Sequence, residues 1–295
     1  MLKFAAIDIG SNAIRMQVSR VTIYEGNITF KKLEYVRFPL RLGQDVFTQG
    51  AISEASREKF IQLMRAFKIL IDLYEVDDYM ACATSAMRDS SNGKEVIKAV
   101  KKQIGLQIEV IDGDKEAEII NKAIFPHMDH QTYLHIDVGG GSTELNLFVA
   151  HQKVAAHSFQ IGSVRRLSSE TNSPIWKEME EWVKKQVKTN YGRVQAIGTG
   201  GNINKVLDLS NKKPGKAVSL KRIQEVQKYI GSFSMEERVN KLQLNPDRAG
   251  VIIPALDIYM TVMRMAKASS IIVPDSGMKD GMMQLLFERN KERLT

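Results

Sequence analysis

The sequence has a single cysteine among its 295 residues. Cys82 therefore cannot form a disulfide within the chain, and its place in the apolar run 79–84 predicts a buried thiol. No segment approaches the ~18 to 20 consecutive apolar residues of a membrane span, and no signal-peptide pattern follows Met1. These absences predict a cytoplasmic protein, in a reducing compartment, with no membrane partner.

Motifs of the common nucleic-acid-binding folds are also lacking. No helix-turn-helix, zinc or ribonucleoprotein motif occurs, and the basic residues are not interleaved with aromatic ones. The pairs Lys184-Lys185 and Lys212-Lys213 are typical of a solvated surface. Yet 42 basic against 34 acidic residues give a net charge of +8, which suggests a polyanionic partner. We expect no specific nucleic acid, and a phosphate-rich small molecule or polymer suits the charge equally well.

Two segments of the chain share one order of residues at a predicted strand–loop–strand turn. In the first, Asp8 and an isoleucine lead into Gly10 and small polar residues before a strand at 14–18. In the second, Asp137 and a valine lead into three glycines and a serine before a strand at 145–149. Glycines let the backbone approach a ligand closely and direct successive N–H groups toward it. The pattern predicts two phosphate-binding hairpins, in similar domains that face each other across a cleft.

Either loop alone is weak evidence, because most Gly/Ser turns are only tight hairpins. Two copies with the same order of Asp, apolar, Gly and small polar residues favour a shared function. The aspartate beside each loop is out of place for a bare anion, so we expect a divalent metal or a catalytic water there. The strand before the second loop, at 133–136, is apolar like a central strand, which predicts its loop at a strand end.

The alternation of strand and helix patterns predicts a mixed α/β fold with an internal structural repeat. The length suffices for two domains, and the pattern breaks at 125–131. We expect an N-terminal domain at 1–126 and a C-terminal domain at 127–295, whose last helix near 277–290 packs back on the first domain. The other expected elements are strands near 3–9, 13–24, 28–38, 79–84, 107–112, 132–138, 143–150, 153–160, 194–198 and 270–273, and helices near 53–74, 93–103 and 114–124.

Two further segments resemble phosphate corners. Small polar residues and Arg88 follow the strand near 79–84, where a helix N-terminus and a guanidinium could bind phosphate together. An exposed loop cation is an equally weighted reading of Arg88. At 196–204 a strand enters a helix through Gly200 and Gly201, which is a generic phosphate or nucleoside corner.

A third segment, at 110–118, carries acids where a strand, predicted to be buried, turns into a helix. It places three carboxylates at the start of that helix, where acids commonly complement the helix dipole. Without further context, Glu116 is an ordinary helix-start glutamate.

Taken in order, these motifs resemble the exopolyphosphatase / guanosine pentaphosphate phosphohydrolase (Ppx/GppA) family over residues 4 to about 287. The motifs that carry the resemblance are Asp-Ile-Gly-Ser-Asn-Ala-Ile-Arg at 8–15, Arg-Leu-Gly at 41–43, Ala-Thr-Ser-Ala-Met-Arg at 83–88, the segment 113–117, Asp-Val-Gly-Gly-Gly-Ser-Thr-Glu at 137–144, Gly-Ser-Val-Arg at 162–165, Gly-Thr-Gly-Gly at 198–201 and Asp-Ser-Gly-Met-Lys-Asp-Gly at 275–281. Each motif is modest, but the ordered set is specific.

The resemblance implies two ribonuclease H-like domains of the actin, sugar kinase and heat-shock chaperone ATPase superfold. It also implies that Glu116 is the base that activates water, which reverses the reading of that residue given above. Longer members of the family add a C-terminal helical module, and this chain is expected to be a short form without it. Two positions depart from the family: Ala13 replaces a usual hydroxyl residue, and Lys115 replaces a frequent second acid.

The resulting hypothesis is hydrolysis of a terminal phosphoanhydride bond, with Glu116 as base and Arg88 as the second catalytic residue. Mg²⁺ is the expected cofactor, because it binds phosphate oxygens through few carboxylates and several waters. Its expected ligands are Asp8, Asp137 and Glu144. The expected phosphate-binding residues are Gly10, Ser11, Asn12, Arg15, Gly139, Gly140, Gly141, Ser142, Thr143, Gly200 and Gly201.

Several alternatives stay open at this stage. The substrate is inorganic polyphosphate or guanosine pentaphosphate, or both, with terminal phosphate release from polyphosphate as the leading hypothesis. A kinase of the same superfold would pass phosphate to an acceptor, and a nucleotide sensor or filament subunit would not catalyse at all. The oligomeric state is equally open, with a twofold homodimer as the commonest arrangement.

Overall fold

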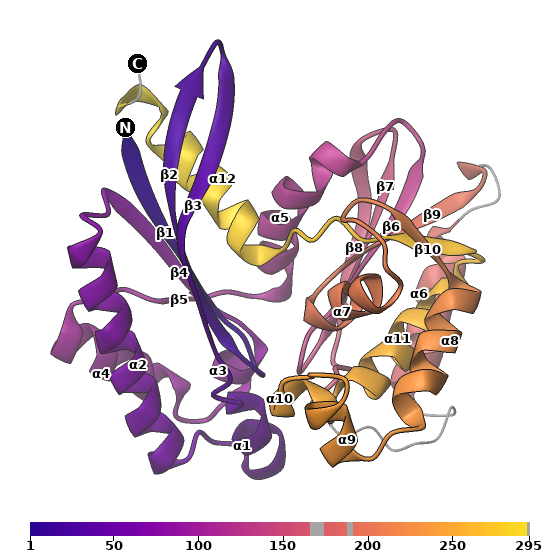
Figure 1. The fold of residues 1–295 in the computed structure, drawn as a ribbon, viewed down its shortest axis with the longest axis horizontal. Coiled ribbons are helices and arrows are strands. Elements are labelled where there is room, and N and C mark those ends of the chain that lie inside the picture. Colours follow the sequence, from indigo (N-terminus) through magenta and orange to yellow (C-terminus); the bar gives the residue numbers. More distant parts are fainter. Residues whose placement is uncertain (166–173, 188–190, 294–295) are drawn as a thin grey trace. The chain divides into compact units, whose positions relative to one another are not determined.

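The computed structural model describes residues 1–165, 174–187 and 191–293. The chain divides into two compact units, and we describe each by itself (Figure 1). Unit 1 comprises Met1–Ala123 together with Gly277–Thr295, and unit 2 comprises Ile124–Ser276. Within the described residues, no helix is both long and apolar enough to cross a membrane.

Unit 1 is built on a five-stranded sheet in the order β3-β2-β1-β4-β5. The first three strands form an antiparallel meander, and β4 and β5 run parallel to β1. The strands are β1 (Leu2–Ile9), β2 (Ile14–Tyr24), β3 (Asn27–Phe38), β4 (Asp78–Ala83) and β5 (Glu109–Val110). The helices are α1 (Leu42–Gln49), α2 (Glu54–Leu73), α3 (Ser85–Asp89), α4 (Gly93–Ile104), α5 (Gly113–Ile124) and α12 (Met278–Arg289), followed by the short 3₁₀ helix η3 (Lys291–Arg293).

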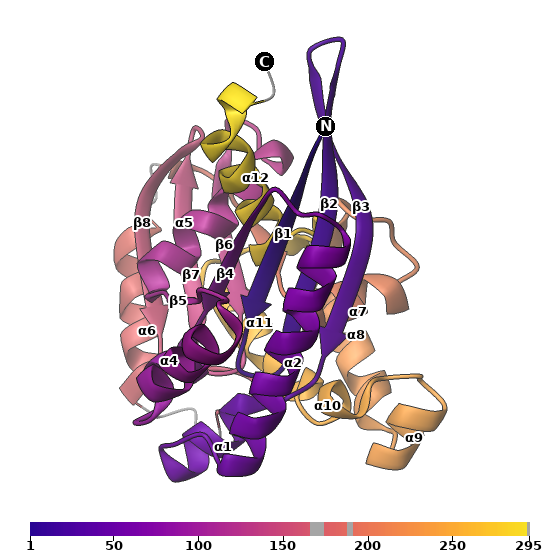
Figure 2. The ribbon, with the colours of Figure 1, turned by 90° about the vertical axis from the view of Figure 1, so that its left-hand side faces the viewer.

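Helices cover both faces of this sheet (Figure 2). Alternate residues of β1 such as Ile7 pack with Phe60 and Phe67 of α2 and with Val96 of α4 in one apolar core. The other face is covered by α12, which packs on β1, β2 and β4. The sheet of unit 1 is therefore buried on two sides, although part of its covering comes from the C-terminal end of the chain.

A glycine sets the approach of α12 to α5. A Cβ added at Gly281 would lie 1.8 Å from the carbonyl oxygen of Ile119, so only glycine allows the two helices to pack this closely. Arg289 adds an ion pair to Asp78 with a distance of 2.7 Å, which ties the other end of α12 to the start of β4.

Unit 2 is built on a six-stranded sheet in the order β10-β11-β9-β6-β7-β8. β6, β7 and β8 repeat the antiparallel meander, and β9 runs parallel to β6. The strands are β6 (Thr132–Val138), β7 (Thr143–Val149), β8 (Gln152–Phe159), β9 (Val194–Thr199), β10 (Ala217–Ser219) and β11 (Ser270–Ile272). The helices are α6 (Pro174–Gln186), α7 (Gly201–Leu209), α8 (Leu220–Gly231), α9 (Met235–Asn240), α10 (Pro246–Ala249) and α11 (Ile252–Met265), with the 3₁₀ helix η1 (Phe125–His127) at the start.

Most of the predicted elements are present, and the exceptions have simple causes. The central position of 132–138 is confirmed, since β6 lies between β9 and β7 and is buried. The predicted buried strand before Glu116 is wrong, because β5 has only two residues and both are exposed at the edge of the sheet. Short α1 and α3 were not predicted, because they span too few turns to show a helical period.

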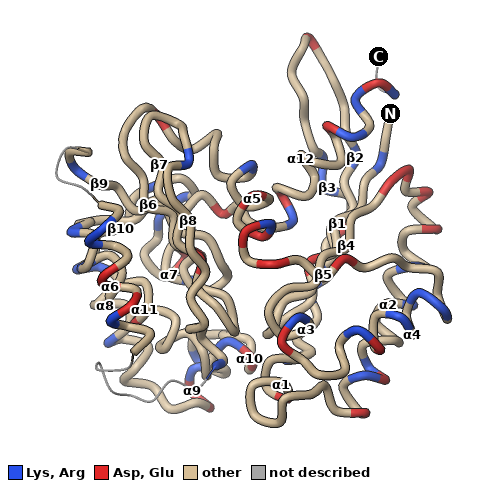
Figure 3. The backbone as a smooth tube through the Cα atoms, turned by 180° about the vertical axis from the view of Figure 1, so that it is seen from behind, with Lys and Arg blue, Asp and Glu red and all other residues tan. Residues whose placement is uncertain are grey.

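Charged residues are spread over the helices of both units, with acidic positions among the basic ones (Figure 3). Lys184 is exposed and pairs with Glu180 at 2.5 Å, and the loop with Lys212 and Lys213 is exposed as well. The solvated-surface interpretation of these lysine pairs is confirmed.

Candidate active-site residues

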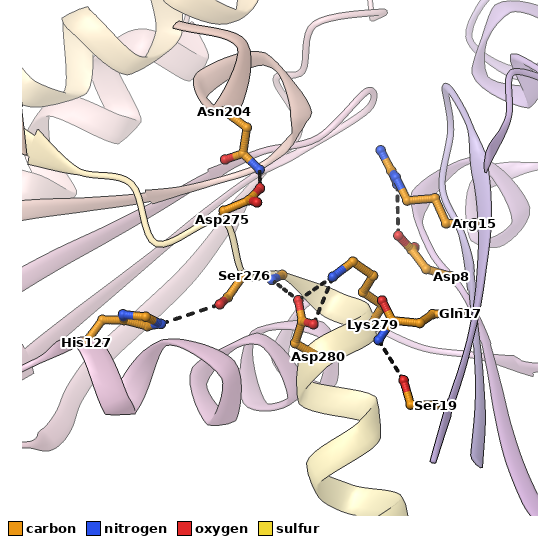
Figure 4. A network of polar contacts seen from close by, with 11 residues as sticks. Asp8, Arg15, Gln17, Ser19, His127, Asn204, Asp275, Ser276, Lys279 and Asp280 are labelled. Atoms are coloured by element: carbon orange, nitrogen blue, oxygen red, sulfur yellow. Dashed lines mark hydrogen bonds and ion pairs between the residues drawn. The ribbon is translucent and has the colours of Figure 1, made fainter. Parts of the chain in front are cut away.

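The first glycine loop connects β1 to β2, and its aspartate forms an ion pair. Asp8 lies directly opposite Arg15 in the antiparallel register. Arg15 Nη1 donates to Asp8 Oδ2 over 2.8 Å (Figure 4). Asp8 is buried with 7% exposure, so the guanidinium compensates a carboxylate that burial alone would disfavour. The predicted metal ligand of unit 1 therefore has a cationic partner within its own domain.

The carbonyl groups of this loop are bound by the segment that enters α1. Gly43 N–H donates to the Ser11 carbonyl over 2.8 Å, and Arg41 N–H donates to the Asn12 carbonyl over 3.1 Å. In a trans peptide the following N–H points the opposite way. The N–H groups of Asn12 and Ala13 are therefore directed away from the α1 segment, as a phosphate ligand requires.

Side chains reinforce the same loop. The hydroxyls of Ser11 and Ser85 lie 2.8 Å apart and both residues are buried. Gly10 is half-buried, and a Cβ there would approach the Ala13 carbonyl oxygen to 3.2 Å. The structure thus brings the predicted phosphate residues Gly10, Ser11 and Asn12 together with the start of α3.

Arg88 lies on α3 and contacts the segment that leads to Glu116. Its Nη1 donates to the Ile111 carbonyl over 2.8 Å, and its Nε lies 3.6 Å from Asp89 Oδ1. The side chain is 29% exposed. Arg88 is therefore fastened to the end of the strand rather than free in a loop, and its remaining exposed surface is available to an anion.

Glu116 lies in the first turn of α5 and is half-buried. Its N–H donates to the Asp112 carbonyl over 3.0 Å, which begins the helix. The pKa of the Cys82 thiol is raised to about 12, first by burial and then by the charges of neighbouring acids that include Asp8 and Glu116. Asp8 and Glu116 therefore both lie close enough to Cys82 for their charges to act on it.

The second glycine loop connects β6 to β7, and it pairs two acids. Asp137 lies directly opposite Glu144 in the register. Glu144 is 2% exposed, and its Oε1 accepts a hydrogen bond of 2.9 Å from Ser158 of β8. Two carboxylates at opposite positions repel each other unless a cation or a proton is shared.

The carbonyls of the second loop are bound by the segment 163–165. Ser163 N–H donates to the Gly139 carbonyl over 2.9 Å, and Arg165 N–H donates to the Gly140 carbonyl over 3.0 Å. Arg165 Nε also donates to the Gly141 carbonyl over 2.8 Å. As in unit 1, the N–H groups that follow these carbonyls are directed away from the supporting segment.

A further glycine permits this support. A Cβ at Gly162 would lie 2.5 Å from the carbonyl carbon and oxygen of Gly140, so no side chain fits between the two backbones. Ser142 and Thr143 complete the loop: Ser142 accepts from Gly139 N–H over 3.0 Å, and the Thr143 hydroxyl donates to the Ile161 carbonyl over 2.6 Å. The Thr143 hydroxyl proton is thus donated to the supporting segment rather than to a ligand.

The third corner lies where β9 enters α7. Gly200 has a φ of 111°, which an L side chain rarely adopts. A Cβ there would meet the Tyr259 hydroxyl at 3.0 Å and Asp137 Oδ1 at 3.1 Å. Gly201 begins α7, and Asn204 of the same helix donates to Asp275 over 2.5 Å (Figure 4). Unit 2 therefore brings Asp137, Glu144 and both glycine corners together.

Sequence reasoning assigned no role to several supporting residues. Ser163 and Arg165 entered only as part of a family motif, and Tyr259 of α11 was not considered. Tyr259 is fully buried and its hydroxyl donates to the Thr199 carbonyl. Its pKa is raised, first by burial and then by the charge of Asp137. A pattern of apolar residues at helical spacing gives no sign of such a hydroxyl.

The expected metal ligands come from both units, Asp8 from the first and Asp137 and Glu144 from the second. No group of three or more His, Cys, Asp or Glu side chains within the described ranges is placed to hold a metal ion. Two opposed, mostly buried carboxylates nonetheless suit Mg²⁺, which is commonly held by one or two carboxylates together with water and substrate phosphates. The donor set of unit 2 fits this ion.

Comparison with known proteins gives a consistent result. The model of the Ppx/GppA phosphatase family matches residues 21–289. Among solved structures, a Ppx/GppA family member from Aquifex aeolicus has 25% identity and a TM-score of 0.75, with 100% of this chain and 99% of that chain covered. An exopolyphosphatase from Cytophaga hutchinsonii has 22% identity and a TM-score of 0.81, with 97% and 98% covered.

Curated relatives extend the comparison. A bifunctional 3-dehydroquinate synthase/phosphatase from Fusobacterium nucleatum is 29% identical over 96% of this chain and 46% of its own length. Exopolyphosphatase 1 from Mycobacterium bovis is 26% identical over 56% of this chain and 47% of its own length. The matches thus span about half the length of these curated relatives. Because the family model matches most of the chain, the protein belongs to the Ppx/GppA phosphatase family, and it has the two-domain, actin-like ATPase fold of that family's solved members.

Proposed function

We propose that the protein hydrolyses phosphoanhydride bonds and releases terminal phosphate from inorganic polyphosphate. The observation that carries the proposal is the common construction of the two hairpin loops. In each hairpin, N–H groups from a nearby segment of the same unit donate to the loop carbonyls. These donors belong to Arg41 and Gly43 in unit 1 and to Ser163 and Arg165 in unit 2. Successive N–H groups are then held ready for phosphate oxygens before substrate arrives, which is electrostatic preorganisation.

Glu116 is the proposed base. It stands at the start of α5 beside the segment that Arg88 contacts, and a carboxylate there can orient a water and take its proton. General base catalysis typically contributes ~10² to 10⁴-fold. Arg88, and Arg15 with it, would compensate negative charge on the transferring phosphoryl group, since positioning and electrostatics dominate phosphoryl transfer.

Asp137 and Glu144 are the proposed residues for Mg²⁺, with Asp8 as a third candidate. When bound, the ion would neutralise phosphate oxygens and relieve the repulsion between the two opposed carboxylates of unit 2. Ser158 holds the Glu144 side chain in place with its hydroxyl. Asp8 has the weaker claim, because Arg15 already supplies it with a positive partner.

Polyphosphate is favoured over guanosine pentaphosphate because the mycobacterial relative is named an exopolyphosphatase. Guanosine pentaphosphate hydrolysis is the second candidate, since the family's name covers both groups. A net charge of +8 suits either substrate.

The deciding experiment measures phosphate release from short polyphosphate, long polyphosphate and guanosine pentaphosphate side by side, with and without Mg²⁺. We expect release from polyphosphate that depends on Mg²⁺. Faster release from guanosine pentaphosphate would shift the assignment to the second candidate. Transfer of phosphate to an added acceptor, with none released to water, would instead indicate a kinase.

A further inference from the structure

A buried tyrosine joins the ends of the two strands that carry the glycine corners of unit 2. Val138 N–H donates to the Tyr259 hydroxyl over 3.3 Å, and the same hydroxyl donates to the Thr199 carbonyl. Val138 immediately precedes the glycine loop 139–141, and Thr199 immediately precedes Gly200. A single oxygen atom therefore bridges the last residue of β6 and the last residue of β9.

The two corners approach each other closely at this bridge. A Cβ at Gly200 would come within 3.5 Å of the Val138 carbonyl oxygen and 3.0 Å of the Tyr259 hydroxyl. Asp137, beside Val138, lies in register with Thr199. Any shift of the hydroxyl would thus move both the 139–141 loop and the Gly200 turn.

A second buried network holds the Thr199 side chain. The His135 Nε2 atom and the Thr199 hydroxyl lie 2.9 Å apart, and Asn146 Nδ2 lies 3.1 Å from His135 Nδ1. This geometry suits a neutral imidazole that accepts from Asn146 and donates to Thr199, and burial lowers the pKa of His135 to about 3. The two networks meet at Thr199 but use different atoms, so each can be removed alone.

We propose that Tyr259 is a positioning residue which fixes the separation of the two glycine corners, so that both bind one run of substrate phosphate. The inference rests on the proposed function of these corners as phosphate ligands. Tyr259 has no role as acid or base in it, since its hydroxyl is bound on both sides by backbone groups. The expected consequence is an effect on substrate binding rather than on the bond-breaking step.

The test compares two variants that each delete one buried hydroxyl. Tyr259→Phe cuts the bridge between Val138 and Thr199, whereas Thr199→Val removes only the contact with His135. Tripolyphosphate binding is measured by calorimetry in the presence of Mg²⁺, well below the melting temperature of each variant, and KM and kcat are measured for phosphate release. We expect Tyr259→Phe to weaken binding and raise KM about tenfold, with kcat within about threefold, and Thr199→Val to change KM less than threefold.

Each outcome decides something different. A folded Tyr259→Phe protein with wild-type affinity and KM would overturn the positioning role and leave the proposed function standing. If wild-type protein binds tripolyphosphate without hydrolysing it, and Tyr259→Phe binds more weakly, the positioning role holds and the proposed hydrolysis fails. A wild-type protein that neither binds nor hydrolyses overturns both.

A second measurement uses the wild-type protein and therefore does not depend on whether Tyr259→Phe folds. Hydrogen exchange is followed in peptides over 138–142 and 199–204 as tripolyphosphate is added. Protection of both peptides with the same ligand dependence supports the proposal. Protection of one peptide alone shows that the corners act separately and overturns it.

Discussion

The two hairpins of this protein have the same construction and opposite charge. In unit 1 the residues that lie opposite one another across β1, β2 and β3 are Asp8, Arg15 and Arg37. One acid there faces two cations. The Arg15 guanidinium, 2.8 Å from the Asp8 carboxylate, compensates the negative charge of Asp8 within the domain.

The equivalent row of unit 2 has Asp137, Glu144 and Ser158 on β6, β7 and β8. Two acids there face a hydroxyl, and the Ser158 hydroxyl donates to Glu144. Because the two carboxylates lie opposite one another, a cation beside them would lower their mutual repulsion. The comparison shows that one repeated backbone arrangement carries two different sets of side chains: an acid with two cations in unit 1, and two acids with a hydroxyl in unit 2.

The largest expected effect concerns the chemistry assigned to unit 1. Glu116→Gln should reduce kcat by ~10² or more while tripolyphosphate affinity stays within about threefold, because the amide keeps the shape but cannot take a proton. Glu118→Gln is the matched control on the same helix, since Glu118 is exposed and pairs with Lys115 at 2.9 Å. Turnover of Glu116→Gln close to that of the control would remove Glu116 from the mechanism.

The Mg²⁺ dependence of activity tests which of the two rows of residues holds the metal ion. Glu144→Gln should raise the Mg²⁺ concentration for half-maximal activity by roughly 10- to 100-fold, the range seen when groups around a metal are altered. Asp8→Asn should leave that concentration within about twofold, because the Arg15 guanidinium rather than a metal ion balances Asp8. Equal shifts in the two variants would show that both rows hold the ion.

The segments that support the two loops should differ in how much stability is lost when a glycine is replaced by alanine, and this difference is smaller than the effects above. Gly162→Ala places a Cβ 2.5 Å from the Gly140 backbone, whereas Gly43→Ala meets the Phe47 ring at 2.7 Å and Ser11 Cβ at 2.9 Å. Backbone cannot move aside as a ring can, so Gly162→Ala should cost ~1 to 3 kcal/mol of stability. Gly43→Ala should cost less than Gly162→Ala, because the Phe47 ring can turn aside and only Ser11 Cβ has to shift, by a few tenths of an ångström. Urea unfolding of both variants gives the comparison, and a larger loss for Gly43→Ala would contradict it.

The stability of the two units should also depend differently on pH. All five histidines lie in unit 2, and burial lowers the pKa of His135 to about 3 from 6.5. As the pH falls below 6.5 the unfolded chain gains a proton that the native unit excludes, so the contribution of His135 lowers stability by ~1 to 2 kcal/mol between pH 6.5 and 5. In unit 1 the Cys82 thiol, with a pKa of about 12, stays neutral throughout this range.

The measurement is the free energy of unfolding against pH, with His135→Gln as the comparison. The variant starts less stable because it breaks the contacts with Asn146 and Thr199, but its stability should depend less on pH between 6.5 and 5. Parallel curves for the two proteins would show that His135 takes up no proton on unfolding.

Sequence reasoning predicted features that depend on neighbours along the chain. The β6 strand was predicted from the apolar character of residues 133–136, and the glycine loops from the order of Asp, apolar, Gly and small polar residues that the two segments share. The buried strand before Glu116 failed, because Val110 is apolar yet lies at the edge of its sheet, 38% exposed. Edge and centre differ in what packs against them, and a local pattern does not contain that information.

The supports of the site were harder to predict for a related reason. Tyr259 is 121 residues from Val138 and 60 from Thr199, and its role exists only once the fold brings them together. The charge contrast between Arg15 and Glu144 is visible in the sequence, but its meaning depends on a register that places each opposite an aspartate.

The return of α12 to unit 1 has a consequence for synthesis on the ribosome. Unit 2 is one continuous segment, so it can fold as soon as it emerges. Unit 1 must wait for Gly281 and its neighbours, which are translated after all of unit 2, roughly 10 to 30 s later at ordinary rates. During that interval the face of β1 and β2 on which α12 packs in the finished fold lacks this cover.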